Sequence, residues 1–311
     1  MAGIPAEWGR YPADSAHFLC TKPRKSLESH RRRMLVRNLR SKGGMSRPRA
    51  IEKGVTYLVT RRCFHRQFLL RPSREVNAFV LFCLAYAAKQ SGVQVHGYCV
   101  MANHYHVVLT DVEGKLPVFA HLLNMFVGRG LNAMHGRWES FWAPGSYSAV
   151  KLVEESDVLA KLVYTLQNPV AAGLVESSRS WPGLCSRPED MLGRRMEVSR
   201  PKHFFRKKSK VPACVTLTLA PPPGVDGASF TSCASAMLDL REEQLRAEAR
   251  AKGERFRGAR AVMRQDPFDA PKTFEPRRGL DPRVACRDKW RRIEALQRIK
   301  RFEERYADAW S

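Results

Sequence analysis

The sequence lacks several features that would place it in a familiar class of protein. It has no apolar run of the roughly 18–20 residues that a membrane-spanning helix needs. Its first residues contain no basic-then-apolar leader, which disfavours export. The 8 cysteines form no Cys-x-x-Cys pair, which argues against a zinc ribbon and a disulfide scaffold. No glycine-rich phosphate loop is present, so we expect no nucleotide cofactor. The missing apolar run predicts no membrane partner. Together with the unpaired cysteines, these features predict a protein of the reducing cytoplasm, associated with the nucleoid.

Acidic residues are scarce relative to basic ones. The 311 residues include 54 Lys and Arg against 30 Asp and Glu, which gives a net charge of +24. Residues 1–53 hold 13 basic and 4 acidic residues and residues 186–311 hold 29 and 18, whereas residues 54–185 hold only 12 and 8. Basic flanks are typical of proteins that bind polyanions, because each neutralised phosphate releases counterions. The alternative is a solvated basic tail without a partner, and the central segment decides between the two.

Two histidines stand two positions apart in residues 95–111, a segment rich in β-branched and aromatic residues that predicts a strand. Residues i and i+2 of a strand point to the same face. His104 and His106 would therefore present two imidazoles side by side, with Tyr105 on the opposite face. Two imidazoles at this spacing can hold one divalent cation. The alternative is a pair of ordinary, half-buried histidines.

A second segment, residues 154–170, has apolar residues at helical spacing. We expect Ser156 to cap the start of this helix and Pro169 to end it. Tyr164 and Asn168 are four positions apart and share a face. A tyrosine beside a metal can act as a nucleophile, and an amide oxygen can be a third ligand. The alternative is a tyrosine packed in the core and an asparagine that caps the end of the helix.

Together the two segments resemble a known family. The His-hydrophobic-His strand, followed by Tyr-x-x-x-Asn-Pro-Val-x-Ala-Gly-Leu-Val from Tyr164 to Val175, is similar to the single-tyrosine HUH transposases, and within them to the REP-associated tyrosine transposases. Gly54–Arg62 matches a third piece, with Leu58 standing where relatives often carry a histidine outside the core catalytic set. The resemblance spans about residues 45–186. Residues 1–44 are therefore expected to be a dispensable arm or an artefact of an upstream start codon.

The resemblance implies an enzyme that cleaves and rejoins single-stranded DNA beside a hairpin. Tyr164 would form a covalent 5′-phosphotyrosine and release a 3′-hydroxyl. His104, His106 and Asn168 would hold Mg²⁺ or Mn²⁺, although these ligand types would also accept Zn²⁺. Asn168 is preferred to its neighbour Gln167, which would lie about 100° around the helix. The implied partner is single-stranded or hairpin DNA, and the protein would be a monomer or a homodimer.

The apolar periodicity predicts the element order β-α-β-β-α-β-α, with strands at residues 55–60, 93–101, 104–110 and 147–153. The helices are expected from residues 72–75 up to Gly92, at residues 116–134 and around Tyr164. This order is the ferredoxin-like split β-α-β arrangement, an α+β fold with an antiparallel sheet and helices on one face, and the HUH fold is similar. We expect three regions: a basic flexible arm (1–48), a catalytic domain (49–186) and a basic C-terminal extension (187–311) with helices near residues 235–257 and 288–306.

Several basic and aromatic residues are candidates for contact with DNA. Trp138, beside Arg137 and close to Phe141 and Trp142, could stack unpaired bases. A hydrophobic plug under the sheet is the more ordinary interpretation of these aromatic residues. The basic flanks could hold a hairpin stem through its phosphates. The candidate DNA-binding residues are Arg61, Arg62, Arg137, Trp138, Arg206, Lys207 and Lys208.

Three functions compete at this point. The first is an active HUH transposase, or a domesticated nuclease that keeps the chemistry. The second is a DNA-binding protein with a decayed site that acts on repeat sequences, which the intact His-x-His motif and Tyr164 disfavour. The third is an unrelated metal-dependent hydrolase that uses water. Such a hydrolase needs a general base, and no carboxylate is obviously placed for that role.

Overall fold

The computed structural model describes residues 48–202, 205, 209–273 and 282–309, all of which belong to one compact unit. The predicted arm up to residue 47 and the basic run Arg206, Lys207 and Lys208 lie outside the described residues. Among the helices that are described, none combines the length and apolarity of a bilayer crossing.

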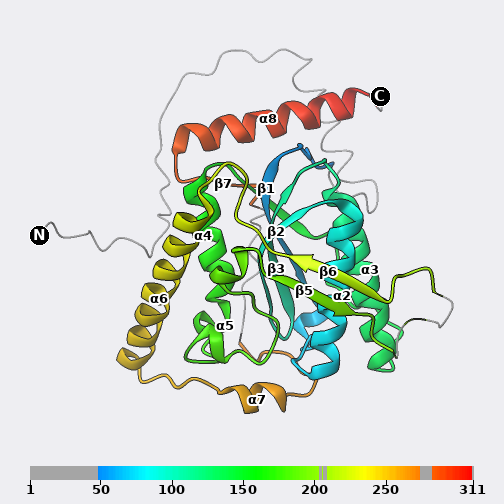
Figure 1. Cartoon of the computed structure of the whole chain (residues 1–311), viewed down its shortest axis with the longest axis vertical. Coiled ribbons are helices and arrows are strands. Elements are labelled where there is room, and N and C mark those ends of the chain that lie inside the picture. Colours follow the sequence, from blue (N-terminus) through cyan, green and yellow to red (C-terminus); the bar gives the residue numbers. More distant parts are fainter. Residues whose placement is uncertain (1–47, 203–204, 206–208, 274–281, 310–311) are drawn as a thin grey trace, which may run out of the picture. The chain divides into compact units, whose positions relative to one another are not determined.

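The first seven main elements follow the predicted order β-α-β-β-α-β-α. They are β1 (Val55–Arg62), α2 (Arg74–Ser91), β2 (Gln94–Val100), β3 (His104–Asp111), α3 (Leu116–Met134), β4 (Ser148–Leu152) and α4 (Glu155–Leu166). The strands lie in the order β2-β3-β1-β4, and every neighbouring pair among these four is antiparallel. This is the split β-α-β topology, so the predicted α+β fold class is confirmed (Figure 1).

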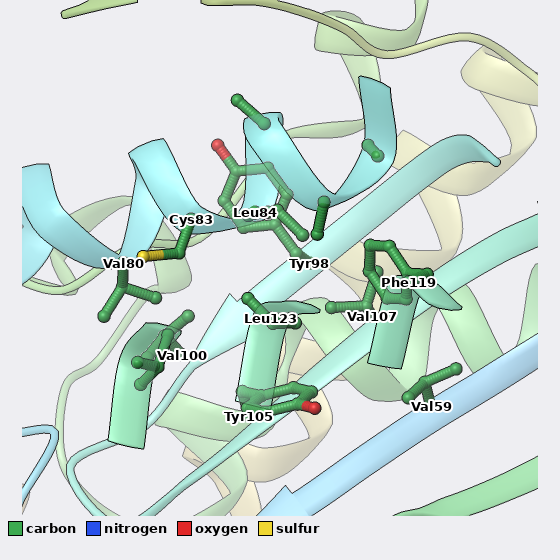
Figure 2. Close-up of a cluster of buried hydrophobic side chains, with 14 of the residues drawn as sticks. Val59, Val80, Cys83, Leu84, Tyr98, Val100, Tyr105, Val107, Phe119 and Leu123 are labelled. Carbon is green, nitrogen blue, oxygen red and sulfur yellow. The ribbon is translucent and has the colours of Figure 1, made fainter. Parts of the chain in front are cut away.

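Alternate residues of the strands supply two separate cores, one on each face of the sheet. Tyr57 and Val59 of β1 belong to the larger core under α2 and α3, whereas Leu58 between them packs with α4. Figure 2 shows the larger core, where Tyr105 of β3 lies among side chains of the sheet and of α2 and α3. The two helices of the split unit cover one face, and α4 covers the other.

Local signals place α2 where the sequence predicts it. The Ser73 side chain accepts a hydrogen bond from the backbone N–H of Val76 (3.1 Å) at the start of the helix. Gly92 ends the helix in the left-handed conformation, with φ of 70°. Between β2 and β3 the chain turns tightly, with the N–H of Met101 donating to the carbonyl of His104 (2.8 Å).

Residues after 186 add to both faces and to one edge of the sheet. The strands β5 (Arg195–Ser199) and β6 (Cys214–Thr218) form a two-stranded sheet on α2, and β7 (Val284–Ala285) pairs with β4 in parallel. The predicted C-terminal helices correspond to α6 (Gly227–Ala251) and α8 (Lys289–Asp308). The shorter helices are η1 (Phe64–Arg66), α5 (Asn168–Ala171), η2 (Ser178–Ser180), η3 (Pro188–Met191) and α7 (Ala259–Met263). Residues on both sides of residue 186 pack in the same hydrophobic cores. The boundary between catalytic domain and C-terminal extension therefore remains a prediction about function.

His96 of β2 fastens the segment after β6 to the sheet. Its side chain is fully buried, with Nδ1 2.7 Å from the carbonyl oxygen of Ala220 and Nε2 2.7 Å from Oγ1 of Thr110. A carbonyl can only accept, so Nδ1 carries the ring proton and donates it to Ala220. Burial lowers the pKa of His96 to about 4, although the hydrogen bond to Ala220 opposes this shift. The ring is therefore neutral in the folded protein above that pH.

We predict that His96 makes the protein acid-sensitive. In the unfolded chain its pKa is about 6.5, so between pH 6.5 and about 4 the unfolded state binds a proton that the folded state does not. The free energy of unfolding should fall by about 3 kcal/mol as the pH drops through this window, and His96 has no such effect above it. Urea unfolding of His96→Gln should show a flatter pH dependence, whereas His121→Gln, at an exposed position, should keep the wild-type slope. Equal slopes for all three proteins would contradict this assignment.

Candidate functional site

His104 and His106 lie together on the sheet face that α4 covers. Their ring centroids are 4.9 Å apart, and Val108, two positions further along β3, packs in the core beneath α4. Tyr105 lies on the opposite face and donates its hydroxyl to Oδ1 of Asn124 (2.9 Å). The predicted alternation of these three side chains is confirmed.

Each histidine is held by a hydrogen bond at Nδ1. Oδ1 of Asn103 lies 2.7 Å from Nδ1 of His104, and Nδ2 of Asn103 donates to the carbonyl of Arg66 (3.1 Å). With its amide nitrogen so used, Asn103 can only accept from His104, so Nδ1 of His104 is protonated and Nε2 carries the lone pair. Oγ1 of Thr60 lies 2.8 Å from Nδ1 of His106 and can accept in the same way. This arrangement is typical of histidines that bind a metal through Nε2.

The helix α4 approaches the sheet closely because β2 has a glycine beneath it. A Cβ atom on Gly97 would lie 2.5 Å from Cδ1 of Leu162 and 3.2 Å from Oγ of Ser186, so a side chain there would displace the Leu162 side chain from this contact. The β2–β3 register shifts between Val95 and Gly97, which marks a bulge at this contact. The glycine therefore sets how near the helix lies to the strands.

The start of α4 differs from the sequence prediction. The N-cap residue is Glu154, and the assignment of this role to Ser156 is wrong. Glu154 and Asp157 form a capping box, in which the N–H of Glu154 donates to Oδ2 of Asp157 (3.1 Å). A hydroxyl residue is the more usual cap, but a carboxylate is also suited to the positive end of the helix dipole.

Residues just before and within α8 clamp this capping box. The N–H of Arg287 donates to Oδ1 of Asp157 (2.9 Å), and Nη1 of Arg291 pairs with Oε1 of Glu154. Sγ of Cys286 lies 4.0 Å from Oε2 of Glu154. Glu154, Asp157 and Cys286 are close enough together to suggest a cation site. Both carboxylates are already engaged by N–H groups and an arginine, so the cluster acts as a helix cap joined to the C-terminal segment.

Tyr164 projects from α4 beside the histidine pair. Its ring centroid is 5.5 Å from that of His106, with the rings nearly perpendicular (82°). Nζ of Lys161, one turn earlier, lies 5.3 Å from the Tyr164 centroid. Burial raises the pKa of Tyr164, and a hydrogen bond from the Asn168 side chain opposes the shift. The phenol is therefore protonated at neutral pH in this structure.

Asn168 lies just beyond the end of α4, as expected from Pro169. The helix ends at Leu166, and Asn168 opens the separate short helix α5, with Pro169 in its first turn. Gln167 between the two helices keeps a near-helical backbone (φ −74°, ψ −10°). Tyr164 and Asn168, four positions apart, therefore still contact each other. Nδ2 of Asn168 donates to the carbonyl of Tyr164 (2.8 Å), which leaves Oδ1 as the remaining acceptor of the amide.

Gln167 lies on a different side of the helix. It is buried, and its Oε1 accepts no hydrogen bond from the residues that the structure describes. Helix geometry places it on one flank of Tyr164 and places Lys161 and Asn168 on the other. This placement favours Asn168 over Gln167 beside the histidines. Lys161 was not among the sequence candidates, and its position three residues before Tyr164 was the available signal.

The candidate DNA-binding residues near β1 separate into two groups. Arg62 is exposed and stands opposite His104 in the β1–β3 register, so it shares the face of the histidines. Arg61 donates to the carbonyls of Gly145 (2.8 Å) and Ala143 (3.1 Å), which fixes the loop before β4. Arg62 is therefore the better placed of the two to meet a ligand.

The aromatic cluster after α3 also divides. Phe141 and Trp142 are buried in the larger core, so the hydrophobic plug is the right interpretation for them. Trp138 is 95% exposed, as a residue that stacks on a base would be. Its neighbour Arg137 donates to Oε1 of Gln67 (2.6 Å) and holds the surrounding loop.

No protein-family model and no curated protein matches the chain. Among solved structures, a REP-associated tyrosine transposase bound to a REP hairpin aligns with 53% of this chain and 100% of its own, at 16% identity and a TM-score of 0.40. A candidate transposase from Deinococcus radiodurans R1 aligns with 40% of this chain and 97% of its own, at 19% identity and a TM-score of 0.28. Likenesses of this strength carry no conclusion about function, which must come from the site itself.

We predict that the Thr60 hydroxyl supports metal binding by His106. Thr60→Val removes the hydrogen bond at Nδ1 with little change in shape, and loss of such a partner typically weakens metal binding about 10–100-fold. Titration of the full chain with MnCl₂ in a calorimeter should show this loss. Thr60→Ser keeps the hydroxyl and should bind as the wild type does. Equal affinity of the valine variant would rule out the supporting role.

Proposed function

We propose that this protein is a single-tyrosine HUH transposase or nuclease that cleaves and rejoins single-stranded, hairpin-flanked DNA. Tyr164 is the nucleophile, and His104, His106 and Asn168 hold Mg²⁺ or Mn²⁺. The observation that carries the proposal is the meeting of a tyrosine, 5.5 Å from His106, with a histidine pair whose rings are 4.9 Å apart. This set of residue types, on a strand and an adjacent helix, also matches the motifs of the family that the sequence resembles.

The donor set fits a divalent cation, because Asn103 leaves the lone pair of His104 on Nε2 and Asn168 keeps an amide oxygen. When bound, the cation would neutralise phosphate charge and favour the tyrosine phenolate. Oη of Tyr164 attacks the phosphorus and the P–O3′ bond breaks. The phenol loses its proton, O3′ ends as a hydroxyl, and the 5′-phosphate stays on Tyr164. One diester replaces another, so the reverse reaction rejoins a strand without ATP.

Tyr164 must be activated before it can act as a nucleophile, because a tyrosine is a neutral phenol at neutral pH. Burial raises its pKa, so without further positive charge the ring is a neutral phenol and a poor nucleophile. Lys161 Nζ lies 5.3 Å from the centre of the Tyr164 ring, and the His106 ring lies 5.5 Å from it. A phosphate bound beside Tyr164 would therefore lie close to these groups.

The two other functions have less support in the geometry. A decayed site would have no need of the hydrogen bonds that Thr60 and Asn103 make to the histidines, and both are present. A hydrolase would need a carboxylate to activate water. The acidic residues at the start of α4, Glu154 and Asp157, are engaged in the helix cap.

We predict that Tyr164→Phe abolishes covalent capture of DNA and leaves binding intact. Labelled hairpin DNA with a single-stranded flank would be incubated with protein and Mn²⁺ and resolved on a denaturing gel. The wild type should give a protein–DNA band that requires metal. Tyr86→Phe, on the opposite side of the sheet, should give the same band as the wild type. A covalent band in Tyr164→Phe would place the nucleophile elsewhere.

The helix α8 offers a basic surface for the DNA stem. Its docked side includes Ala295, Ile299 and Ala307, which are buried or packed against neighbouring residues. Its outer side exposes basic residues, of which Arg298, Arg301 and Arg305 lie on one face by helix geometry. Basic side chains in a row along a helix suit contact with successive phosphates. We propose that this face of α8 holds the hairpin stem.

We predict that replacing Arg298, Arg301 and Arg305 together by Gln weakens hairpin binding and its salt dependence. The slope of log K against log salt should become shallower by about 0.9 for each duplex phosphate that the variant leaves unneutralised. Fluorescence anisotropy of the full chain at several salt concentrations measures this slope. Truncation near residue 186 is a poorer test, because β5, β6 and α6 pack on the core.

The matched control removes three positive charges at the distal end of α6 and just beyond it, as Arg250→Gln, Lys252→Gln and Arg255→Gln. These residues are also exposed, so this variant has the same net charge as the α8 variant. It should keep the wild-type slope. If both variants lose binding equally, net charge alone explains the effect and α8 has no specific role.

A further inference from the structure

Lys161 is a half-buried lysine on the same helix as the proposed nucleophile. It lies on α4 one turn before Tyr164, and its Nζ is 5.3 Å from the centre of the Tyr164 ring. Its charge also reaches His106, whose pKa is lowered by burial first, then by His104 and by Lys161. Lys161 is therefore close to the Tyr164 ring, and its charge acts on His106.

No carboxylate neutralises Lys161 among the residues that the structure describes. Other lysines have such partners, as Lys151 has with Glu52 (2.8 Å). The nearest acidic residue on the same face of α4, Asp157, accepts hydrogen bonds from Glu154 and Arg287 instead. An ammonium that no carboxylate neutralises can pair with an anionic ligand.

We propose that Lys161 binds a non-bridging oxygen of the scissile phosphate and holds the phosphorus in front of Tyr164. The inference rests on the proposed function and adds a residue to it. A cation held by the two histidines would repel the ammonium, because both lie near His106. A phosphodiester placed between them relieves this repulsion, since it has two non-bridging oxygens and can offer one to each positive group. The same contact orients the diester for in-line attack.

A purely structural role would have different consequences. An ammonium that only packs over the Tyr164 ring would contribute to the stability of α4 and would not sense the DNA. A phosphate ligand, in contrast, must respond to the charge of one particular phosphate. The two roles are therefore separated by changing that phosphate and leaving the protein fold unchanged.

The experiment first uses the wild-type full chain to map the cleaved linkage by covalent capture with Mn²⁺. Binding is then measured by anisotropy in the Tyr164→Phe background, in EDTA, so that neither cleavage nor a bound metal affects the readout. One DNA carries the natural phosphodiester at the mapped position, and the other carries an uncharged methylphosphonate there. Lys161→Gln is compared with Lys161→Arg, which keeps the charge, and with Lys89→Gln, an exposed lysine of α2.

With natural DNA, we expect Lys161→Gln to bind about fivefold or more weakly and to have a salt slope shallower by about 0.7. With methylphosphonate DNA, Lys161→Gln and its parent should bind within about twofold of each other. Lys161→Arg should retain most of the affinity, and Lys89→Gln all of it. An equal loss on both DNAs, or no loss on either, would overturn the assignment of Lys161 while the adduct of the wild type upholds the proposed function. Failure of the wild type to form any adduct would overturn both.

Discussion

The contact between α4 and β2 at Gly97 is the constraint on which the site depends. The Leu162 side chain occupies the space that a Cβ atom on Gly97 would need, so this leucine packs directly on the backbone of the strand. The helix carries Tyr164 and the neighbouring strand carries His106, and the spacing of these two side chains follows from that contact. The buried packing of Val108 and Leu58 against the same helix keeps it there. The spacing of Tyr164 and His106 is thus set by apolar packing.

Positive charge then decides what the site can accept. Lys161 and Arg62 lie on the face of the histidines, and the chain as a whole carries a net charge of +24. A fixed set of positive groups attracts an anion over distances of about a Debye length and holds it more strongly in a partly desolvated site. Tyr164, neutral at rest, is the one member of the group whose ionisation would oppose this charge. The same positive groups thus favour an anionic ligand on this face of the sheet.

Much of the site follows from periodicity, which the sequence displays directly. A period of two placed His104 and His106 together and Tyr105 apart, and a separation of four brought Asn168 to Tyr164 even though a new helix starts at Asn168. The features that the sequence did not reveal depend on distant partners. The helix cap at Glu154 and Asp157 is held by Arg287 and Arg291. The two residues of β7 form a strand because they pair with β4. Lys161 was missed because a lysine on an amphipathic helix usually belongs to its solvated face.

The clamp on the start of α4 ties the order of synthesis to the order of assembly. Arg287 and Asp157, which meet there, are 130 positions apart in the chain. A ribosome releases the four antiparallel strands, the histidine pair and Tyr164 well before it releases the residues that complete the cap. A nascent chain therefore contains every group of the proposed chemistry while the first turn of α4 still lacks its partners. The cap of this helix is completed only when nearly all of the described chain has left the ribosome.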